Sequence, residues 1–238
     1  MAIGPNRKVM SRAQAEAAAV DVGLRAYMLR VYNYMCVALA LTGAVAFFVS
    51  TNETLLYAIY GTPLKWVVFL APLGMVFFLA ARIHKMSATA AQTTFWIFAG
   101  LMGMSLASIF IVYTPESVTR VFFITAGAFA GLSLVGYTTK KDLSGMGTFL
   151  FMGVIGLVIA MVVNMFLGSS MQQLGISVIG VLIFAGLTAY DTQKIKEMYL
   201  ESDSSEVMGK KAILGALRLY FDFLYLFLML LRLFGSRR

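Results

Sequence analysis

Two aspartates, Asp191 and Asp222, are the side chains whose type and position point most directly to chemistry in this chain. Asp222 interrupts a long apolar stretch, Leu219-Tyr220-Phe221-Asp222-Phe223-Leu224-Tyr225-Leu226. If such a stretch crosses a membrane, an ionised and unpaired carboxylate is costly there, so it is kept where it is paired, wetted or used. Two such groups can share a proton, or offer oxygen ligands to a hard cation such as Ca²⁺.

The two carboxyl groups would titrate as a unit if they meet. Burial disfavours the charged form of each, and two neighbouring carboxylates disfavour ionising together. Gain or loss of one proton would then exchange a hydrogen bond for a repulsion. The sequence therefore predicts a pH sensor or gate formed by Asp191 and Asp222, with both as candidate calcium ligands.

A purely structural role is the competing interpretation for both aspartates. Arg218 precedes Asp222 by four residues, so the two could form an ion pair along one face of a helix. Asp191 lies three residues before Lys194 and could be solvated at an interface. Residue types alone leave these alternatives open.

Composition indicates a polytopic membrane protein of one domain. Of its residues, 60% are hydrophobic and 13% charged, whereas soluble domains contain about 25% charged residues. The single cysteine, Cys36, excludes an intramolecular disulfide, and no Cys/His cluster indicates a resident metal or other cofactor. The net charge of +8 comes from basic residues at segment ends, so we expect no nucleic-acid partner.

Seven segments are long enough to span a bilayer, which takes about 20 apolar residues. They cover residues 29–50, 64–82, 93–113, 118–138, 147–168, 173–193 and 210–234. The prediction is an all-α bundle of seven transmembrane helices whose neighbours are antiparallel, because the connections are short. Residues 1–28 form a cytoplasmic or interfacial segment with an alanine-rich helix, and residues 29–238 form the transmembrane domain.

The distribution of basic residues predicts a cytoplasmic N-terminus. The connections on that side then hold thirteen basic residues, against Lys65 and Arg120 on the other. The thirteen are Arg7, Lys8, Arg12, Arg25, Arg30, Arg82, Lys85, Lys140, Lys141, Lys194, Lys196, Lys210 and Lys211. Arg232, Arg237 and Arg238 oppose this bias if the last segment crosses fully, and a re-entrant segment would return them inside. We expect a full crossing, because the segment is long enough.

Small residues predict where helices approach closely. Gly127 and Gly131 form a GxxxG pattern, and the third segment is lined at helical spacing by Ala99, Gly100, Gly103 and Ala107. Such residues allow backbones to touch within lipid.

The sixth and seventh segments should form an antiparallel hairpin that brings the aspartates near each other. With a sixth helix that ends near Leu200 and a seventh that begins near Met208, Asp191 lies about 13 Å and Asp222 about 21 Å from the turn. An offset or tilt of one helix must absorb the difference of about 8 Å before the two groups can touch.

Three segments of the chain resemble the signature of the Bax inhibitor-1 family, the transmembrane Bax-inhibitor-motif proteins, and its prokaryotic members most closely. The first is Ala189-Tyr190-Asp191-Thr192-Gln193. The second is Leu219-Tyr220-Phe221-Asp222-Phe223, followed by Leu230-Leu231-Arg232-Leu233-Phe234-Gly235. The third is Lys140-Lys141-Asp142-Leu143-Ser144. Length, span number and short loops agree over essentially the whole chain.

The resemblance implies six helices around a central, hydrophobic seventh, and a pH-sensitive calcium leak gated by an aspartate pair. Asp191 and Asp222 match that pair. Arg82 matches an arginine that latches the sixth-helix aspartate in the closed form, although the loop after it differs in length. Some members carry a further acid in the second helix, whereas residues 70–75 contain none here, which bears on calcium selectivity.

We therefore expect a pH-sensitive calcium or cation leak channel of a bacterial inner membrane, with the bilayer and calcium ions as partners. The alternative is a non-transporting regulatory protein, a modulator of a membrane AAA protease or of stress and cell-death responses. An intramembrane aspartyl protease is disfavoured, because Leu219-Tyr220-Phe221 replaces the Gly-x-Gly that precedes the second aspartate of such enzymes. We expect no enzymatic activity.

Overall fold

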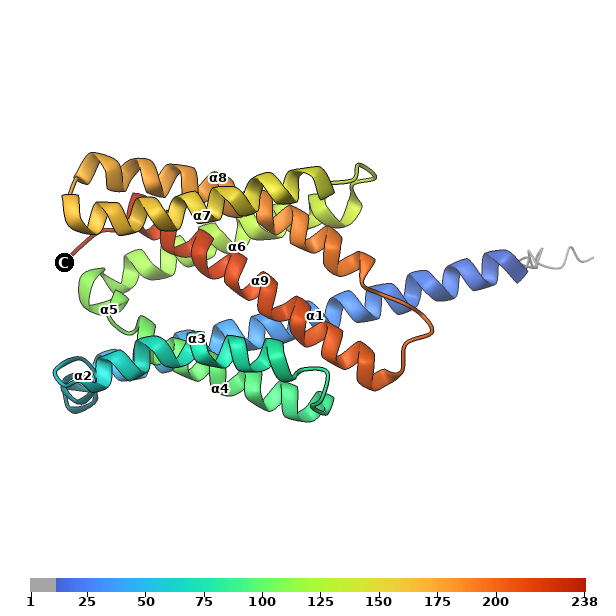
Figure 1. Cartoon of the computed structure of the whole chain (residues 1–238), viewed down its shortest axis with the longest axis horizontal. Coiled ribbons are helices and arrows are strands. Elements are labelled where there is room, and N and C mark those ends of the chain that lie inside the picture. Colours follow the sequence, from blue (N-terminus) through green and yellow to red (C-terminus); the bar gives the residue numbers. More distant parts are fainter. Residues whose placement is uncertain (1–11) are drawn as a thin grey trace, which may run out of the picture.

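The computed structural model describes residues 12–238, which form a bundle of long helices (Figure 1). Seven of the described helices are long and apolar enough to cross a membrane. They are α1 (Arg12–Thr51), α3 (Leu64–Arg82), α4 (Ala88–Leu106), α6 (Pro115–Thr138), α7 (Ser144–Leu167), α8 (Ser170–Glu197) and α9 (Ser205–Phe234). The all-α prediction with seven spans is confirmed. Residues 1–11 of the predicted N-terminal segment lie outside the described part of the chain.

The helix α1 continues through the predicted boundary at residue 28. It is 40 residues long, and its apolar spanning part is Asp21–Thr51. The alanine-rich lead-in and the first span are thus one helix. A separate domain over residues 1–28 stays a prediction.

Two short helices lie at the turns of one bundle end. The eight-residue α2 (Glu53–Tyr60) was not predicted; it starts at Asn52, whose side chain accepts a hydrogen bond from the Leu55 amide at 3.1 Å. The four-residue α5 (Ile109–Val112) continues the third span after a break. The Tyr60 hydroxyl joins the two turns, because it donates to the Met104 carbonyl at 2.7 Å and accepts from the Ser108 amide at 3.1 Å.

The connections α3–α4, α6–α7 and α8–α9 lie together at one end of the bundle, which we call the basic end (Figure 1). α2, α5 and the C-terminus lie at the other end, so α9 crosses the whole bundle. The last residues pair with the α5–α6 turn through a bridge between Tyr113 and Arg237 and a bond from the Thr114 amide to the Ser236 carbonyl at 3.1 Å. The expected full seventh crossing is confirmed, and the re-entrant alternative is wrong.

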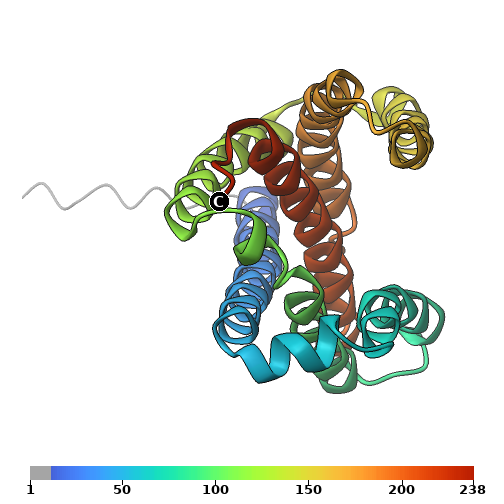
Figure 2. The same ribbon diagram turned by 90° about the vertical axis from the view of Figure 1, so that its left-hand side faces the viewer.

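Helix α9 is the central element. In its most apolar stretch 72% of the residues are buried, against 11% in α7. α1, α4, α6 and α8 pack directly on it, whereas α3 and α7 pack mainly on α4 and α8 at the periphery (Figure 2). The predicted central seventh helix is confirmed, and the six others surround it in two tiers.

Close helix approach occurs at glycines that differ in part from the predicted ones. A Cβ added at Gly103 of α4 would lie 2.6 Å from the Thr42 carbonyl of α1, as the small-residue spacing predicts. At Gly100, Gly127 and Gly131 an added Cβ would meet no atom within 4 Å, so the prediction of close approach is wrong at Gly100 and for the GxxxG pattern. Gly136 is the contact point of α6 instead, and it faces α8.

Candidate functional site

Asp191 of α8 and Asp222 of α9 meet in the interior of the bundle. Their carboxyl groups are close enough for their charges to interact. Asp222 is only 4% exposed, and the side chain of Asp191 is 16% exposed. Two carboxyl groups can share a hydrogen bond only when one of them carries a proton. A hydrogen bond between Asp191 and Asp222 would therefore depend on a proton.

The two aspartates lie close together although their distances from the α8–α9 connection differ by more than the sequence predicted. α8 ends at Glu197 and α9 begins at Ser205. Measured along the helices, Asp191 is then about 9 Å and Asp222 about 26 Å from the connection. The oblique course of α9 and the outward reach of residues 198–204 absorb this difference (Figure 1).

Lys211 fixes the course of the α8–α9 connection. Its ammonium group lies 2.5 Å from the Asp203 carboxylate and donates to the Met198 carbonyl at 2.9 Å. Both partners lie in the connection, and Lys211 lies in the second turn of α9. This clamp sets where α9 starts, and hence the level at which Asp222 meets α8.

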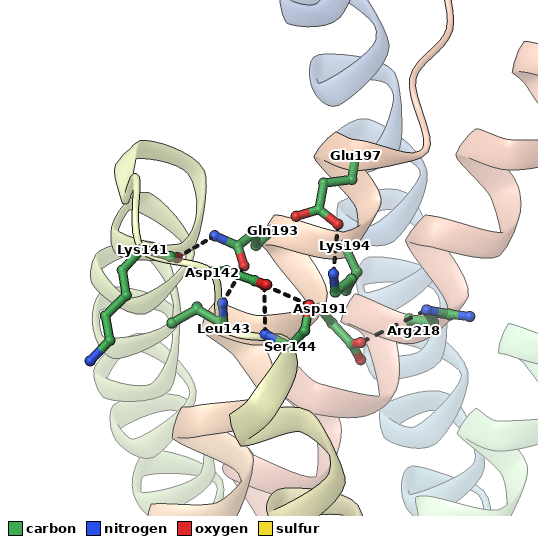
Figure 3. A network of polar contacts seen from close by, with 9 residues as sticks. All are labelled: Lys141, Asp142, Leu143, Ser144, Asp191, Gln193, Lys194, Glu197 and Arg218. Atoms are coloured by element: carbon green, nitrogen blue, oxygen red, sulfur yellow. Dashed lines mark hydrogen bonds and ion pairs between the residues drawn. The ribbon is translucent and has the colours of Figure 1, made fainter.

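Arg218 is the cation nearest to Asp191. Its Nη1 lies 3.9 Å from Asp191 Oδ1, across the α8–α9 interface (Figure 3). The sequence suggested Asp222, on the same helix, as its ion-pair partner; the closest carboxylate belongs to the other helix. The Arg218 side chain is 53% exposed, so solvent screens the pair and its contribution to stability is small.

One oxygen of Asp222, Oδ2, is buried without a hydrogen-bond partner among the described residues. Leaving a buried polar atom unpaired costs about 1–3 kcal/mol, and more when the group is charged. A proton, a water molecule or a cation would relieve this cost. The unpaired oxygen is the feature that most clearly separates Asp222 from a structural aspartate.

A cavity of about 670 Å³ adjoins Asp191. Its walls come from α7, α8 and α9, and they include Tyr190, Arg218 and Tyr225. A second cavity of about 470 Å³ lies between α3, α4 and α9. Phe221 and Tyr225 line both cavities, so these two aromatic side chains separate them.

Glycines hold α8 between its neighbours at the level of Asp191. A Cβ at Gly136 of α6 would collide with the backbone of Ala189, and a Cβ at Gly147 of α7 would collide with the ring of Tyr190. A larger residue at Gly136 would push α8 away, whereas one at Gly147 would have to displace the end of the Tyr190 side chain. The two residues before Asp191 are thus fixed from two sides.

Gln193 fastens the α6–α7 loop to α8, two residues beyond Asp191. Its side chain donates to the Lys141 carbonyl at 2.9 Å and accepts from the Leu143 amide at 2.8 Å (Figure 3). Two of the segments that resemble the family signature, residues 140–144 and 189–193, are therefore joined in one structural unit. Sequence reasoning did not assign this role, although a glutamine so near the membrane span is a signal for it.

Asp142 closes the same network at the start of α7. Its Oδ1 accepts from the Ser144 hydroxyl at 2.5 Å and from the Ser144 amide at 2.8 Å. These two hydrogen bonds, the hydroxyl first, hold the pKa of the Asp142 carboxyl below its usual range. The loop beside the aspartate pair is therefore anchored by a carboxylate that stays ionised.

A chain of hydroxyl groups joins three helices next to Asp191. Thr192 donates to the Thr188 carbonyl at 2.7 Å, so it must accept from Ser133 at 2.9 Å. Ser133 in turn accepts from Tyr32 at 2.5 Å. The chain links α1, α6 and α8 and satisfies these three hydroxyl groups. Sequence reasoning missed it, because single serines and threonines in apolar segments carry no spacing signal.

Arg82 stands apart from the aspartate pair. It is exposed at the end of α3, which packs on α4. Among the residues whose side chains are described, no ion pair joins Arg82 to Asp191. Its role as a latch stays a prediction, and Arg218 occupies the place nearest to Asp191.

The aspartate pair does not resemble a dedicated metal centre. No group of three or more His, Cys, Asp or Glu side chains able to hold a metal ion occurs in the described part of the chain. Ca²⁺ takes six to eight oxygen ligands, of which Asp191 and Asp222 supply only part. Water and backbone carbonyls would have to complete the shell, which suits an ion in passage better than a resident one.

Comparison with known proteins decides the family. The family model described as "Inhibitor of apoptosis-promoting Bax1" matches residues 24–238. The chain belongs to the Bax inhibitor-1 family. The inner membrane protein YbhL of Escherichia coli K12 is 45% identical over 91% of this chain and 94% of its own length. An uncharacterised protein of Rickettsia prowazekii is also 45% identical, over 92% of both chains.

More distant relatives extend over the same length. An uncharacterised membrane protein of Streptococcus pyogenes serotype M3 is 34% identical over 90% of this chain and 94% of its own. Neither the Bax inhibitor-1 family description nor these names contain an enzymatic activity. Together with its seven spans, family membership makes the chain an integral membrane protein.

Proposed function

We propose that this Bax inhibitor-1 protein is a pH-sensitive cation leak channel, with calcium favoured, in which Asp191 and Asp222 form the gate. The observation that carries the proposal is the closeness of the half-buried Asp191 of α8 to the buried Asp222 of the central helix, with one Asp222 oxygen unpaired. A structural pair would have its oxygens satisfied. The unpaired oxygen is available to a proton or a cation.

Protons would act through the α8–α9 interface. With one proton on the pair, the two carboxyl groups hold the helices together through a hydrogen bond. Without it, two negative charges repel in an apolar environment; with a second proton, Asp191 no longer attracts Arg218. Each protonation state therefore favours a different α8–α9 contact, which is the differential interaction that a pH-driven transition requires.

The two cavities beside α9 define the proposed route. The cavity at Asp191 and the cavity between α3, α4 and α9 are separated by Phe221 and Tyr225. Phe221, Tyr225 and Phe184 of α8 form a stack, with ring centroids 6.0 Å and 5.0 Å apart. A shift of α9 against α8 would move this stack and join the cavities. Asp191 and Asp222 supply the carboxylates that a cation would meet on this proposed route.

Calcium flux in liposomes tests the proposal. Purified protein is reconstituted around a calcium dye, and flux is followed from about pH 5 to pH 8. We compare the wild type with Asp191→Asn and Asp222→Asn. Asp21→Asn is the matched control, because it makes the same change at an exposed aspartate of α1.

Wild-type and Asp21→Asn flux should depend on pH, and both gate variants should lose that dependence. Flux that keeps its pH dependence in Asp191→Asn and in Asp222→Asn would remove the pair as the gate. Flux no greater than that of empty liposomes at every pH would overturn the channel itself. A non-transporting regulatory role would then be the better account of this family member.

We also propose the inner membrane of a bacterium as its location, with a cytoplasmic N-terminus. YbhL of Escherichia coli is named an inner membrane protein. The basic residues gather at the basic end of the bundle, although the full crossing of α9 adds Arg232, Arg237 and Arg238 to the opposite end. Thirteen basic residues on the proposed inner side still exceed the five on the outer side.

A further inference from the structure

A lateral groove separates α1 from α6 on the face of the bundle away from α3 and α7. α1 packs on α4 and α9, and α6 packs on α8 and α9, so α9 forms the floor between them. One cavity of about 680 Å³ and another of about 290 Å³ lie along this groove. Both are lined by Leu39, Ala40, Phe122 and Phe223, so they are continuous.

The groove has the length of a membrane span. Its lining on α1 extends from Arg25 to Ala46, which corresponds to about 32 Å of helix. The hydrocarbon core of a bilayer is about 30 Å thick. The groove is therefore long enough to hold a lipid acyl chain along its axis.

The walls of the groove are apolar over almost their whole length. Methionine, leucine, alanine and phenylalanine side chains dominate. The Tyr32 and Ser133 hydroxyls, which also line it, are already paired with each other. Such walls offer water few hydrogen-bond partners, whereas an acyl chain fills them without that cost.

The basic end of the groove is cationic. Arg25 lines the groove there and is exposed, and Tyr137 lines it from α6. The ammonium group of Lys196 lies 5.1 Å from the Tyr137 ring centroid and donates to the Tyr137 carbonyl at 2.9 Å. No carboxylate lines either cavity. Arg25 thus lines one end of the apolar groove, and Lys196 lies beside Tyr137, a lining residue of the same end.

We propose that the α1–α6 groove binds an anionic phospholipid, with its phosphate at Arg25 and Lys196 and an acyl chain between α1 and α6. The apolar body and the cationic end match the two parts of such a lipid. The floor residue Phe223 follows Asp222 directly, so the bound chain touches the helix that carries Asp222. Lipid occupancy is in this way coupled to the position of α9.

Cys36 provides a probe inside the groove. It lines the larger cavity, is exposed, and is the only cysteine of the chain. Delipidated protein in detergent is titrated with phosphatidylglycerol or with zwitterionic phosphatidylcholine. The rate of Cys36 alkylation by a small maleimide reports occupancy of the groove, and native mass spectrometry of the same samples counts the lipid molecules retained.

Phosphatidylglycerol should slow alkylation at lower concentration than phosphatidylcholine. Arg25→Gln should raise the half-protecting concentration of phosphatidylglycerol about fivefold and that of phosphatidylcholine less, because the choline group offsets the charge of its phosphate. Arg30→Gln is the matched control, because Arg30 is an exposed arginine of the same helix outside the groove lining. Ala130→Phe, which fills the groove from its exposed wall, should reduce the number of lipids retained.

Three results would overturn the proposal. Equal protection by both lipids, unchanged by Arg25→Gln, would show that no headgroup is recognised. Absence of protection together with absence of a retained lipid would show that the groove does not hold lipid. Protection that rises with protein concentration and needs no lipid would show that a second copy of the chain covers the groove. None of these readouts depends on ion flux.

Discussion

Arg218 Nη1 lies 3.9 Å from Asp191 Oδ1 on the neighbouring helix, although Asp222 is four residues away on its own helix. This cross-helix relationship makes Arg218 a candidate for the latch that the family resemblance assigns to Arg82. The two arginines lie on different helices, α9 and α3, so single substitutions can tell them apart.

Arg218→Gln should shift the pH dependence of flux, whereas Arg82→Gln should not. Removal of the cation nearest to Asp191 favours the protonated carboxyl, so the midpoint of the flux profile should move to higher pH. The shift should stay below about one pH unit, because Arg218 is half-exposed and screened. Liposome flux profiles of the three proteins measure it. A shift of the flux midpoint in Arg82→Gln, with none in Arg218→Gln, would instead identify Arg82 of α3 as the latch.

Gly136→Ala should destabilise the protein by about 1–3 kcal/mol, because the added methyl group would collide with the Ala189 backbone and push α8 from α6. The control is Gly131→Ala on the same helix, where an added Cβ meets no atom within 4 Å. That change should be neutral or stabilising, since alanine is the better helix former. Thermal unfolding in detergent compares the two; equal loss of stability would contradict the close approach at Gly136.

The hydrogen bonds at Asp142 should weaken in acid. Its pKa in the folded protein is lowered by Ser144, so this contribution is fully present above the usual aspartate value of about 3.9. It is lost as the pH falls through the lower value of the folded state. Hydrogen exchange at the Ser144 amide should therefore lose protection only in that acidic window, after correction for the intrinsic rate.

The cap of α9 offers an internal control for that measurement. The Val207 amide is bonded to the Ser204 hydroxyl at 3.3 Å, which does not titrate in acid. Its protection should not change over the same range. Asp142→Ala should remove the protection of the Ser144 amide already at neutral pH. Equal acid sensitivity of both amides would point to general unfolding instead.

Tyr225→Ala should raise cation flux, because Tyr225 belongs to the aromatic stack between the two cavities. Tyr57→Ala is the control, since Tyr57 is 73% exposed on α2 and lines neither cavity. Calcium flux at a fixed pH measures both. A Tyr225→Ala protein that is folded and leaks no faster than the wild type would remove the stack from the proposed route.

The C-terminus should lie on the outer side of the membrane, because α9 completes a seventh crossing from a cytoplasmic N-terminus. Alkaline phosphatase fused after Arg238 should be active, and green fluorescent protein fused there should be dark. The same reporters after Lys141, in the α6–α7 loop, should give the opposite result. An inactive phosphatase at both positions would contradict the proposed orientation.

The long apolar segments made the fold predictable. Each predicted span coincides largely with a long helix of the structure, because hydrophobic length in lipid determines a helix directly. The third span, 93–113, is the exception in detail, since it includes the break between α4 and α5. The central place of the last helix came from the resemblance, and its full crossing from its length. The short helix α2 was not predicted, because eight residues at an interface carry little periodic signal.

The sequence predicted which aspartates form the candidate site, but it did not predict which side chains they contact. Acidic residues inside apolar segments can be recognised from the sequence alone, so Asp191 and Asp222 could be predicted as site residues. The partner of Arg218 depends on the oblique course of α9, and the importance of Gly136 depends on which face of α6 meets α8. Neither is encoded in local spacing. The Gln193 bonds and the α1–α6 groove likewise exist only once the helices are packed.

The pairing of the C-terminal residues with the α5–α6 turn limits how the central helix can move. Ser236 donates its amide to the Ser117 hydroxyl at 2.8 Å, and Arg238 donates its amide to the Val112 carbonyl at 3.0 Å. A helix fastened at its last residues cannot slide along its axis without breaking these bonds. It can pivot about that end, so the displacement grows along α9 towards Ser205. Any opening of this protein should therefore be a swing of α9 whose amplitude is smallest near the outer surface and largest at the basic end.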